Sequence, residues 1–303
     1  MKPTRSRFSP QHNRHVRERV VQSILFLSAL SAIGITIAVV SILVVESLGF
    51  FRHVSLWDFL TDTQWTPLFA DPRYGVLPLV VATLVVTSIG LLVAVPLGTL
   101  AAIYLGEFAP HRVREVCKPT LEMLSGVPSV VYGYFALLLV TPLLQFVIPG
   151  LPTFNMLSAG LVIGVSIVPF VSSMSEDAMR AVPMDIREGS YAMGATRLQT
   201  AWYVVYPAAL SGIVAAYILA MSVALGQTMI VAIAAGQQAN LTFDPTQPAA
   251  TLTAYIAQVS LGDVARGTIE YQSIFAVGLV LLLMTLVLNI FGHFLRRRFR
   301  ESY

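Results

Sequence analysis

Long stretches without a charged side chain recur along this sequence and restrict what it can fold into. A helix needs about 20 consecutive apolar residues to cross the hydrocarbon core of a bilayer. Six intervals meet this requirement once the uncharged run before Glu176 is divided at the Pro149-Gly150 break. We therefore expect six membrane spans, at about residues 20–45, 77–105, 127–147, 156–174, 208–234 and 271–295.

The composition excludes an ordinary soluble domain. Hydrophobic residues make up 56% of the 303 and charged residues 12%, whereas globular proteins carry about 25% charged residues. With a mean hydropathy of +0.74, the chain has too few charges to cover a surface that faces water. The sequence therefore predicts an all-α integral membrane protein with six transmembrane helices.

The distribution of lysine and arginine predicts the orientation, because cytoplasmic loops are enriched in these residues. If both termini are cytoplasmic, 16 of the 19 lysines and arginines lie inside, and only Arg52, Arg73 and Arg266 lie outside. The expected organisation is a basic cytoplasmic tail at 1–19, a six-span domain at 20–295 and a second basic cytoplasmic tail at 296–303. The net charge of +3 then reflects topology and contact with anionic lipids, and nucleic-acid binding is the weaker alternative.

The motifs of most enzyme classes are missing from the sequence. Lys2 and Lys118 are its only lysines, and neither follows the glycine pattern of a P-loop, so any ATP hydrolysis must come from another chain. The single cysteine, Cys117, excludes an internal disulfide and a thiolate zinc site. The five histidines are not at metal-ligand spacing. We expect no catalytic residue, no metal and no cofactor, and the lack of ionisable groups deep in the spans argues against proton-driven transport.

The polar segment 177–207, between the fourth and fifth expected spans, keeps the pattern of a short helix. Pro183 suits the first turn of a helix, where its missing N–H is not needed. Asp185 and Glu188 complement the positive end of the helix dipole, and Gly194 is expected to end or bend the helix. We expect a cytoplasmic helix followed by a turn.

The same segment resembles the EAA loop of ABC-importer permeases, whose pattern is Glu-Ala-Ala, three residues, Gly, nine residues and Ile-x-Leu-Pro. Glu188, Gly194 and Pro207 stand at matching positions. Four positions depart from the pattern but keep small or apolar residues: Gly189, Ser190, Val204 and Tyr206. The resemblance implies the type I importer-permease fold, with this helix docked into a groove on a cytoplasmic ATPase subunit. The alternative is a plain amphipathic linker.

The resemblance also implies site residues and partners. It assigns ATPase coupling to Asp185, Glu188, Gly189, Ser190, Gly194, Ala195, Thr196 and Pro207. Three stretches are similar to the permeases of phosphate importers: 126–133 (Gly-Val-Pro-Ser-Val-Val-Tyr-Gly), 94–105 and the aromatic 56–67. Together they imply a bacterial inner-membrane protein that passes inorganic phosphate. The implied partners are a second permease subunit in a heterodimer, cytoplasmic ATPase subunits, a periplasmic phosphate-binding protein and membrane lipids, with no nucleic acid.

The fifth expected span departs from the phosphate permeases at two positions. That family carries Arg-Ala-Leu-Gly-Glu-Thr, and Val223 and Gln227 stand here at the Arg and Glu positions. Joint replacement of both partners of a buried ion pair is often nearly neutral, so the favoured interpretation is a structural pair whose loss leaves phosphate transport intact. The second interpretation is a changed coupling mechanism or another oxyanion, such as sulfate, molybdate or tungstate.

The candidate residues of a translocation pathway are small or uncharged: Pro128, Ser129, Gly226, Gln227 and Thr228. Gln227 and Thr228 are equally compatible with a hydrogen bond between helices. A helix that starts at Ser129 would offer N–H groups to an anion, although capping by Ser125 or Ser129 also fits. Gly226 is expected to permit close approach of two helices.

Two further interpretations stay open. Trp57, Phe59 and Trp65 fit an aromatic belt at the membrane interface, although a minority of the outer aromatic residues could contact a binding protein. An integral-membrane enzyme acting on lipid-linked substrates would need converging Asp, His or Arg groups at one membrane face. His111 with its neighbouring arginines is the nearest candidate, and the sequence places no carboxylate cluster with them.

Overall fold

The computed structural model describes residues 11–298, and this part of the chain is helical with no strand in it. The first helix already begins at Gln11 and the last ends at Arg298. The remaining residues of the two predicted basic tails, 1–10 and 299–303, lie outside the described residues.

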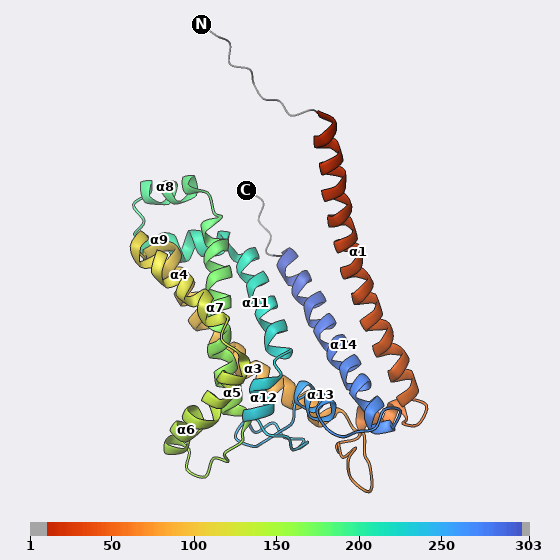
Figure 1. Cartoon of the computed structure of the whole chain (residues 1–303). Coiled ribbons are helices and arrows are strands. Elements are labelled where there is room, and N and C mark those ends of the chain that lie inside the picture. Colours follow the sequence, from red (N-terminus) through yellow and green to blue (C-terminus); the bar gives the residue numbers. More distant parts are fainter. Residues whose placement is uncertain (1–10, 299–303) are drawn as a thin grey trace.

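Within the described residues, five stretches are long and apolar enough to cross a membrane, and a bent pair of helices supplies a sixth. The bent pair joins Arg197–Ala208 to Leu210–Leu225 at an angle of 71°. The spans are built from α1 (Gln11–Phe50), α3 (Leu77–Ile103), α5 (Ser129–Phe135), α6 (Thr141–Val147), α7 (Met156–Arg180), α11 (Leu210–Leu225) and α14 (Ile269–Arg298). The predicted all-α membrane architecture is confirmed (Figure 1).

The elements define two ends of the helical bundle (Figure 1). The start of α1, the last turns of α14 and the short helix α8 (Met184–Ala192) lie at one end, which we call the α8 end. α6, α12 (Met229–Ala234) and α13 (Leu252–Ser260) lie at the opposite end. The first described helix, α1, therefore begins at the same end of the bundle as the loop 177–207, and the last, α14, ends there.

The centre of the bundle is the contact between α3 and α7, where small residues bring two backbones together. A Cβ placed on Gly164 would lie 2.6 Å from Cβ of Val93 and 2.8 Å from the carbonyl oxygen of Gly90. A Cβ on Gly160 would lie 2.7 Å from Cβ of Ile89. Close backbone approach through small residues is the usual basis of helix association in membranes, because lipid is as apolar as the side chains.

The fifth span differs from its prediction, because the helix does not continue to residue 234. α11 ends at Leu225, residues 226–228 are not helical, and α12 begins at Met229. Glycine in a helix costs roughly 0.5–1 kcal/mol relative to alanine, which favours a break at Gly226. The Thr253 hydroxyl donates to the carbonyl of Gln227 at 2.6 Å. This carbonyl at the break therefore has a hydrogen-bond partner, which avoids the free-energy cost of an unpaired backbone carbonyl in the membrane.

An aromatic cluster joins the end of α1 to the segment 51–76 and to α13. Its rings meet edge to face, with Phe50 and Phe59 at 5.6 Å and Trp65 and Tyr255 at 4.9 Å between centroids. Such contacts stabilise a packed core beyond the area they bury. Phe59 and Trp65 are 1% and 4% exposed, so their assignment to an interfacial belt is wrong.

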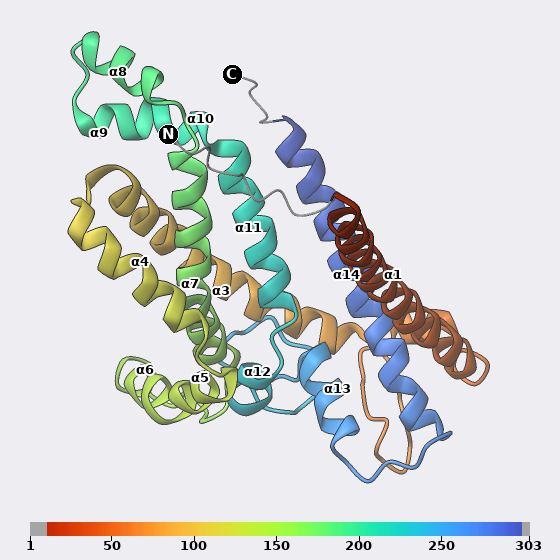
Figure 2. The ribbon, with the colours of Figure 1, turned by 45° about the horizontal axis from the view of Figure 1, so that its top comes forward.

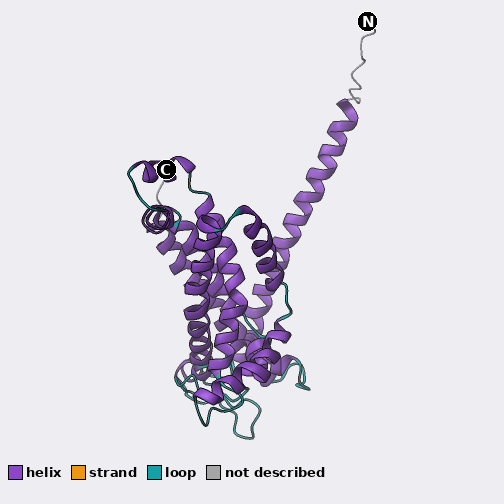
Figure 3. Cartoon of the chain, turned by 90° about the vertical axis from the view of Figure 1, so that its left-hand side faces the viewer, coloured by secondary structure: helices purple, strands orange, loops and turns teal. Residues whose placement is uncertain are grey.

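α1 leaves most of its apolar surface uncovered. It lies beside α14 (Figure 2), and its first half projects from the rest of the bundle (Figure 3). Side chains such as Phe26, Ile35 and Val45 are exposed. A continuous apolar surface of this kind needs lipid or another membrane chain against it.

Candidate functional site

The loop between α7 and α11 folds into a helical hairpin at the α8 end (Figure 2). α8 ends before Gly194, whose φ of +85° suits glycine, and α9 (Arg197–Thr200) follows the turn. Thr196 caps α9 and forms a capping box with Gln199. The π-helical turn η3 (Ala201–Val205) and α10 (Tyr206–Ala208) then lead into α11. The expected helix and the turn at Gly194 are present, with Pro183 as the cap of α8 rather than in its first turn.

The outer face of this hairpin carries three of the predicted coupling residues, Asp185, Glu188 and Gly189, all of them exposed. Large apolar side chains stay exposed on the same hairpin: Met184 (59%), Tyr191 (39%), Met193 (87%) and Leu198 (63%). Exposed Met and aromatic side chains grouped on one loop are typical of a surface that binds another protein.

The other predicted coupling residues build the hairpin itself. The hydroxyls of Ser190 and Thr200 share a hydrogen bond of 2.9 Å across it. Ala195 is half-buried, Thr196 caps α9, and Pro207 is exposed in α10. The predicted set therefore divides into an outward-facing group and a group that holds the turn.

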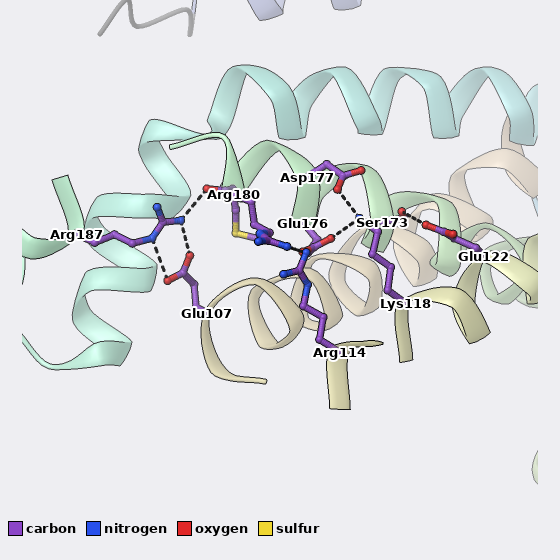
Figure 4. A network of polar contacts seen from close by, with 10 residues as sticks. Glu107, Arg114, Lys118, Glu122, Ser173, Glu176, Asp177, Arg180 and Arg187 are labelled. Carbon is purple, nitrogen blue, oxygen red and sulfur yellow. Dashed lines mark hydrogen bonds and ion pairs between the residues drawn. The ribbon is translucent and has the colours of Figure 1, made fainter. Parts of the chain in front are cut away.

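Arg187, which the sequence analysis did not select, fixes α8 to the bundle (Figure 4). Its buried guanidinium donates to Glu107 Oε1 at 2.9 Å and to Oε2 at 3.5 Å. It also donates to the carbonyl oxygens of Val182 at 2.5 Å and Met179 at 2.9 Å. Glu107 belongs to η1 (Tyr104–Phe108), a π-helical turn that continues α3. One side chain thus joins the hairpin to the ends of both α3 and α7.

A second buried carboxylate, Glu176 near the end of α7, attaches α4 (His111–Ser125) to the bundle (Figure 4). It is fully buried, and it lies 2.6 Å from Arg114 Nη2 and 2.7 Å from Lys118 Nζ. Lys118 also contacts Asp177. Burial by itself lowers the pKa of Lys118, but the contacts with Asp177 and Glu176 outweigh it and raise that pKa above its ordinary value. The ammonium therefore stays charged at neutral pH. Because α4 has no buried residue of its own, these ion pairs are a principal attachment.

The second predicted set of residues lies at two points where the run of helix is interrupted, between α4 and α5 and between α11 and α12. Pro128 precedes α5 and Ser129 is its first residue, while residues 226–228 separate α11 from α12. α5 and α12 pack against each other, and a Cβ on Gly133 would lie 2.9 Å from Cδ1 of Ile233. The structure therefore places the two interruptions at the starts of adjacent helices.

Two expectations about this set are wrong. In the described chain, a Cβ on Gly226 would meet only carbonyls of its own helix, so no second helix approaches there. The Ser125 hydroxyl donates to the carbonyl of Glu122 at 2.6 Å, and no side chain caps α5. The Thr228 hydroxyl donates locally, to the carbonyl of Gly226 at 3.1 Å. These side chains therefore make contacts within their own segments.

A hollow of about 390 Å³ opens beside α4, at the place considered for an enzyme, and is lined by His111, Arg114, Glu115, Lys118, Pro119, Glu122 and Arg180. Carboxylates are present, contrary to the expectation, but each has an imidazole or hydroxyl partner nearby: His111 lies 3.3 Å from Glu115, and Ser173 donates to Glu122 at 3.4 Å. Among the described residues, no three His, Cys, Asp or Glu side chains converge as metal ligands. Arg114 and Lys118 bind Glu176 of α7, whereas the contact of His111 with Glu115 lies within α4.

Comparison with known proteins shows the family to which the chain belongs. The family described as "Binding-protein-dependent transport system inner membrane component" matches residues 94–301. The chain belongs to this family. The probable ABC transporter permease protein YqgH of Bacillus subtilis is 36% identical over 293 residues, which cover 96% of this chain and 94% of that protein. The phosphate transport system permease protein PstC of Xylella fastidiosa is 31% identical over 247 residues, which cover 75% and 74% of the two chains.

A solved structure shows the same fold. A chain of a bacterial ABC transporter involved in the import of the acidic polysaccharide alginate matches with a TM-score of 0.66 at 16% identity. The match covers 95% of this chain and all of that one. The predicted type I importer-permease fold is confirmed, and this permease is a multi-pass membrane subunit of an ABC importer.

The sequence analysis of this permease missed Arg187, Glu107 and Glu176. Two signals were available: Arg187 directly precedes Glu188 of the EAA-like pattern, and the two glutamates stand at the ends of long uncharged intervals. Neither signal identifies the partners, because Arg187 and Glu107 lie 80 residues apart. Sequence spacing relates side chains only within one element.

Replacing Gly194 by alanine is expected to loosen the hairpin of the permease without disturbing its core. A Cβ there meets nothing within 4 Å, so the change acts through the positive φ alone, at a cost of about 1–2 kcal/mol. Amide exchange over residues 184–200 should accelerate about 5- to 30-fold. Gly189→Ala is the matched control, because Gly189 also has open space but lies inside α8, where alanine favours the helix. Equal exchange in both variants would contradict the role of the turn.

Proposed function

We propose that this permease forms, with a second permease subunit, the pathway through which an ABC importer takes up inorganic phosphate. The observation that carries the proposal is the 31% identity to a phosphate permease over 75% of this chain. The stretch 126–133, which resembles the phosphate permeases, contains the start of α5. An anion cannot cross bare hydrocarbon, so polar backbone at interrupted helices is a suitable lining. Such interruptions occur at 126–128 and 226–228, before two helices that pack together.

We assign the outer face of the α8–α9 hairpin to contact with a cytoplasmic ATPase subunit. Glu188 and Asp185 provide charge on this face, and Met184 and Met193 provide exposed apolar surface. A short helix held by a buried arginine can move as a rigid body when its partner moves. The α8 end is then the cytoplasmic end, and both termini of the permease are cytoplasmic, in agreement with the distribution of Lys and Arg.

The remaining partners follow from the two surfaces that the chain leaves uncovered. The apolar side chains of α1 need lipid or another membrane chain, and the second permease subunit is the proposed partner. A solved alginate ABC transporter is described in complex with an alginate pentasaccharide-bound periplasmic protein. For this permease we propose a phosphate-binding protein at the end opposite α8.

A second candidate cargo is another oxyanion, such as sulfate, molybdate or tungstate. Val223 and Gln227 replace the Arg and Glu of the phosphate permeases, and Val223 is 45% exposed in this chain. A side chain at that position faces out of the chain, where lipid, a partner subunit or the pathway can lie. A changed residue there can alter the selectivity for the cargo, which is the observation that favours this candidate.

Uptake of radiolabelled phosphate tests the proposal. The permease is expressed with its cognate subunits in cells that lack their own phosphate importers, and uptake is measured with excess sulfate, molybdate or tungstate as competitors. We expect saturable, ATP-dependent uptake that unlabelled phosphate alone suppresses. Glu188→Ala should reduce this uptake at least about tenfold, the size of effect that removes one contact of roughly 1.4 kcal/mol.

Glu115→Ala is the control for the loss of one acidic side chain, because Glu115 is 65% exposed and belongs to α4 rather than to the hairpin. It should leave uptake close to that of the wild type. Suppression by sulfate, molybdate or tungstate would assign the second cargo class. An assembled complex that hydrolyses ATP but takes up none of these anions would refute both assignments.

A further inference from the structure

Arg187 is placed to carry movement of the hairpin into the spans. We propose that the Arg187–Glu107 pair is a strut that transmits displacement of α8 to α3 and α7 together, so that Arg187 is a positioning residue for transport. The inference rests on the proposed contact between α8 and an ATPase subunit.

The first support is where α8 is held. Arg187 is the buried residue of α8, and the helix otherwise packs on α9 and η3 of its own hairpin, with half-buried Ile186 against the nearby apolar cluster. The guanidinium provides the polar contacts from α8 to Glu107, Met179 and Val182. Displacement of α8 therefore acts on these three groups directly.

The second support is the chemistry of the contact. A guanidinium is planar and donates in fixed directions, so bonds to several acceptors define its orientation as well as its distance. Buried, charge-assisted hydrogen bonds are shorter and stronger than neutral ones. The link is therefore stiff, which a lysine at the same position, with a flexible stem and a point charge, would not reproduce.

The third support is what lies at the far end of the contact. Glu107 is presented by η1, the π-helical turn at the end of α3, and such turns are frequent at functional sites. The Arg197 guanidinium also lies over the Phe108 ring of η1, at 5.7 Å from its centroid. The accepting carbonyls of Met179 and Val182 lie at the end of α7 and just after it. Since α3 and α7 are the most closely packed pair in the bundle, both helices would follow α8 as one unit.

The test measures two properties of the assembled importer: the anion uptake per ATP hydrolysed, and the thermal stability. Arg187→Met alone leaves Glu107 buried without its partner and is expected to destabilise the complex. The double variant Arg187→Met with Glu107→Leu removes both charges, which is often nearly neutral for folding. ATP hydrolysis and anion uptake are measured on the same proteoliposomes, and thermal stability on the same complex. Arg112→Met, an exposed residue of α4, is the control for loss of an arginine at this end.

The expected result is an assembled double variant with near wild-type stability and ATP hydrolysis within about twofold, but at least tenfold less uptake per ATP. The uptake per ATP of Arg187→Lys should lie between that of the wild type and that of the double variant. Normal uptake per ATP in the double variant would overturn the strut and leave the proposed function standing.

If the wild-type complex transports no anion, the proposed function fails instead, and amide hydrogen exchange then tests whether the Arg187–Glu107 pair is a strut. Residues 184–192 should exchange faster in the double variant while α3 and α7 stay protected, and unchanged exchange in α8 would overturn it.

Discussion

Replacing Glu176 by leucine is expected to lower the free energy of unfolding by about 3–5 kcal/mol and to release α4 from the bundle. The carboxylate is fully buried, and it is the shared partner of Arg114 and Lys118. Its removal leaves Arg114 without a carboxylate partner and Lys118 with Asp177 alone, and each of these cations is only about one-fifth exposed. Breaking a buried pair from one side costs more than the pair itself contributes, because the remaining charge stays buried.

Cys117 provides a direct measurement of this release. It is the single cysteine of the chain, it lies on α4 next to Lys118, and it is half-buried. Glu176→Leu should increase its rate of reaction with a maleimide and lower the thermal midpoint of the purified complex. A variant with wild-type midpoint and labelling rate would show that α4 is held by other contacts.

Two further variants separate loss of the pair from loss of an acidic residue. Glu115→Gln removes a carboxylate whose partner His111 is 82% exposed, and it should cost less than about 0.5 kcal/mol. The triple variant Arg114→Leu, Lys118→Met and Glu176→Leu removes the buried carboxylate together with the two cations packed against it, and leaves only the more exposed Asp177 and Arg180. It should recover most of the stability, since replacing all members of a buried ionic group with apolar residues is often neutral or stabilising.

Replacing Gly164 by valine is the second change with a large expected effect. The first added carbon would lie 2.6 Å from Cβ of Val93 and 2.8 Å from the carbonyl oxygen of Gly90. A side chain can change rotamer, but the backbone of α3 cannot yield without moving the whole helix. Overpacking of a tight core costs about 1–3 kcal/mol and occasionally more, and we expect the upper part of this range because the obstacle is backbone.

The measurement is the yield and thermal midpoint of the assembled complex, and both should fall. Gly34→Val is the matched control, because Gly34 lies in α1 and a Cβ there meets nothing within 4 Å. The change there brings only the modest difference in helix propensity between the two residues, which favours valine. If both variants behave alike, close packing of α3 on α7 is not a main source of stability.

Some features of the fold and the site could be predicted because they depend on neighbouring residues. The membrane class and the number of spans follow from uncharged runs that match the thickness of a bilayer. The turn of the hairpin follows from Gly194, since few other residues adopt its φ of +85°. The position of the helix before this turn, between Pro183 and Gly194, follows from local sequence signals in the same way.

Other features were predicted incorrectly, because burial depends on which segments meet. Phe59 and Trp65 have the composition of an interfacial belt but pack into a core with Phe50 and Tyr255. The fifth span reads as continuous to residue 234, yet it breaks at Gly226, where a hydroxyl from distant Thr253 satisfies a carbonyl of the break. The burial of the two aromatic residues has no signal within its own segment, and Gly226 is only a weak signal of a break, because the partner of the freed carbonyl comes from another segment.

By itself the sequence determined that this permease crosses the membrane, how many spans it has and where its exposed hairpin turns. Each of these depends on short-range composition or on the backbone freedom of one residue. Only the tertiary structure decided which charges pair and what they join. Arg187 meets Glu107 across 80 residues, and Glu176 meets Lys118 across 58. The close packing of α3 on α7 sets the positions of the two glutamates, which lie near the ends of these helices. A lone arginine or glutamate in the sequence has a charge but no partner until that packing places one within reach.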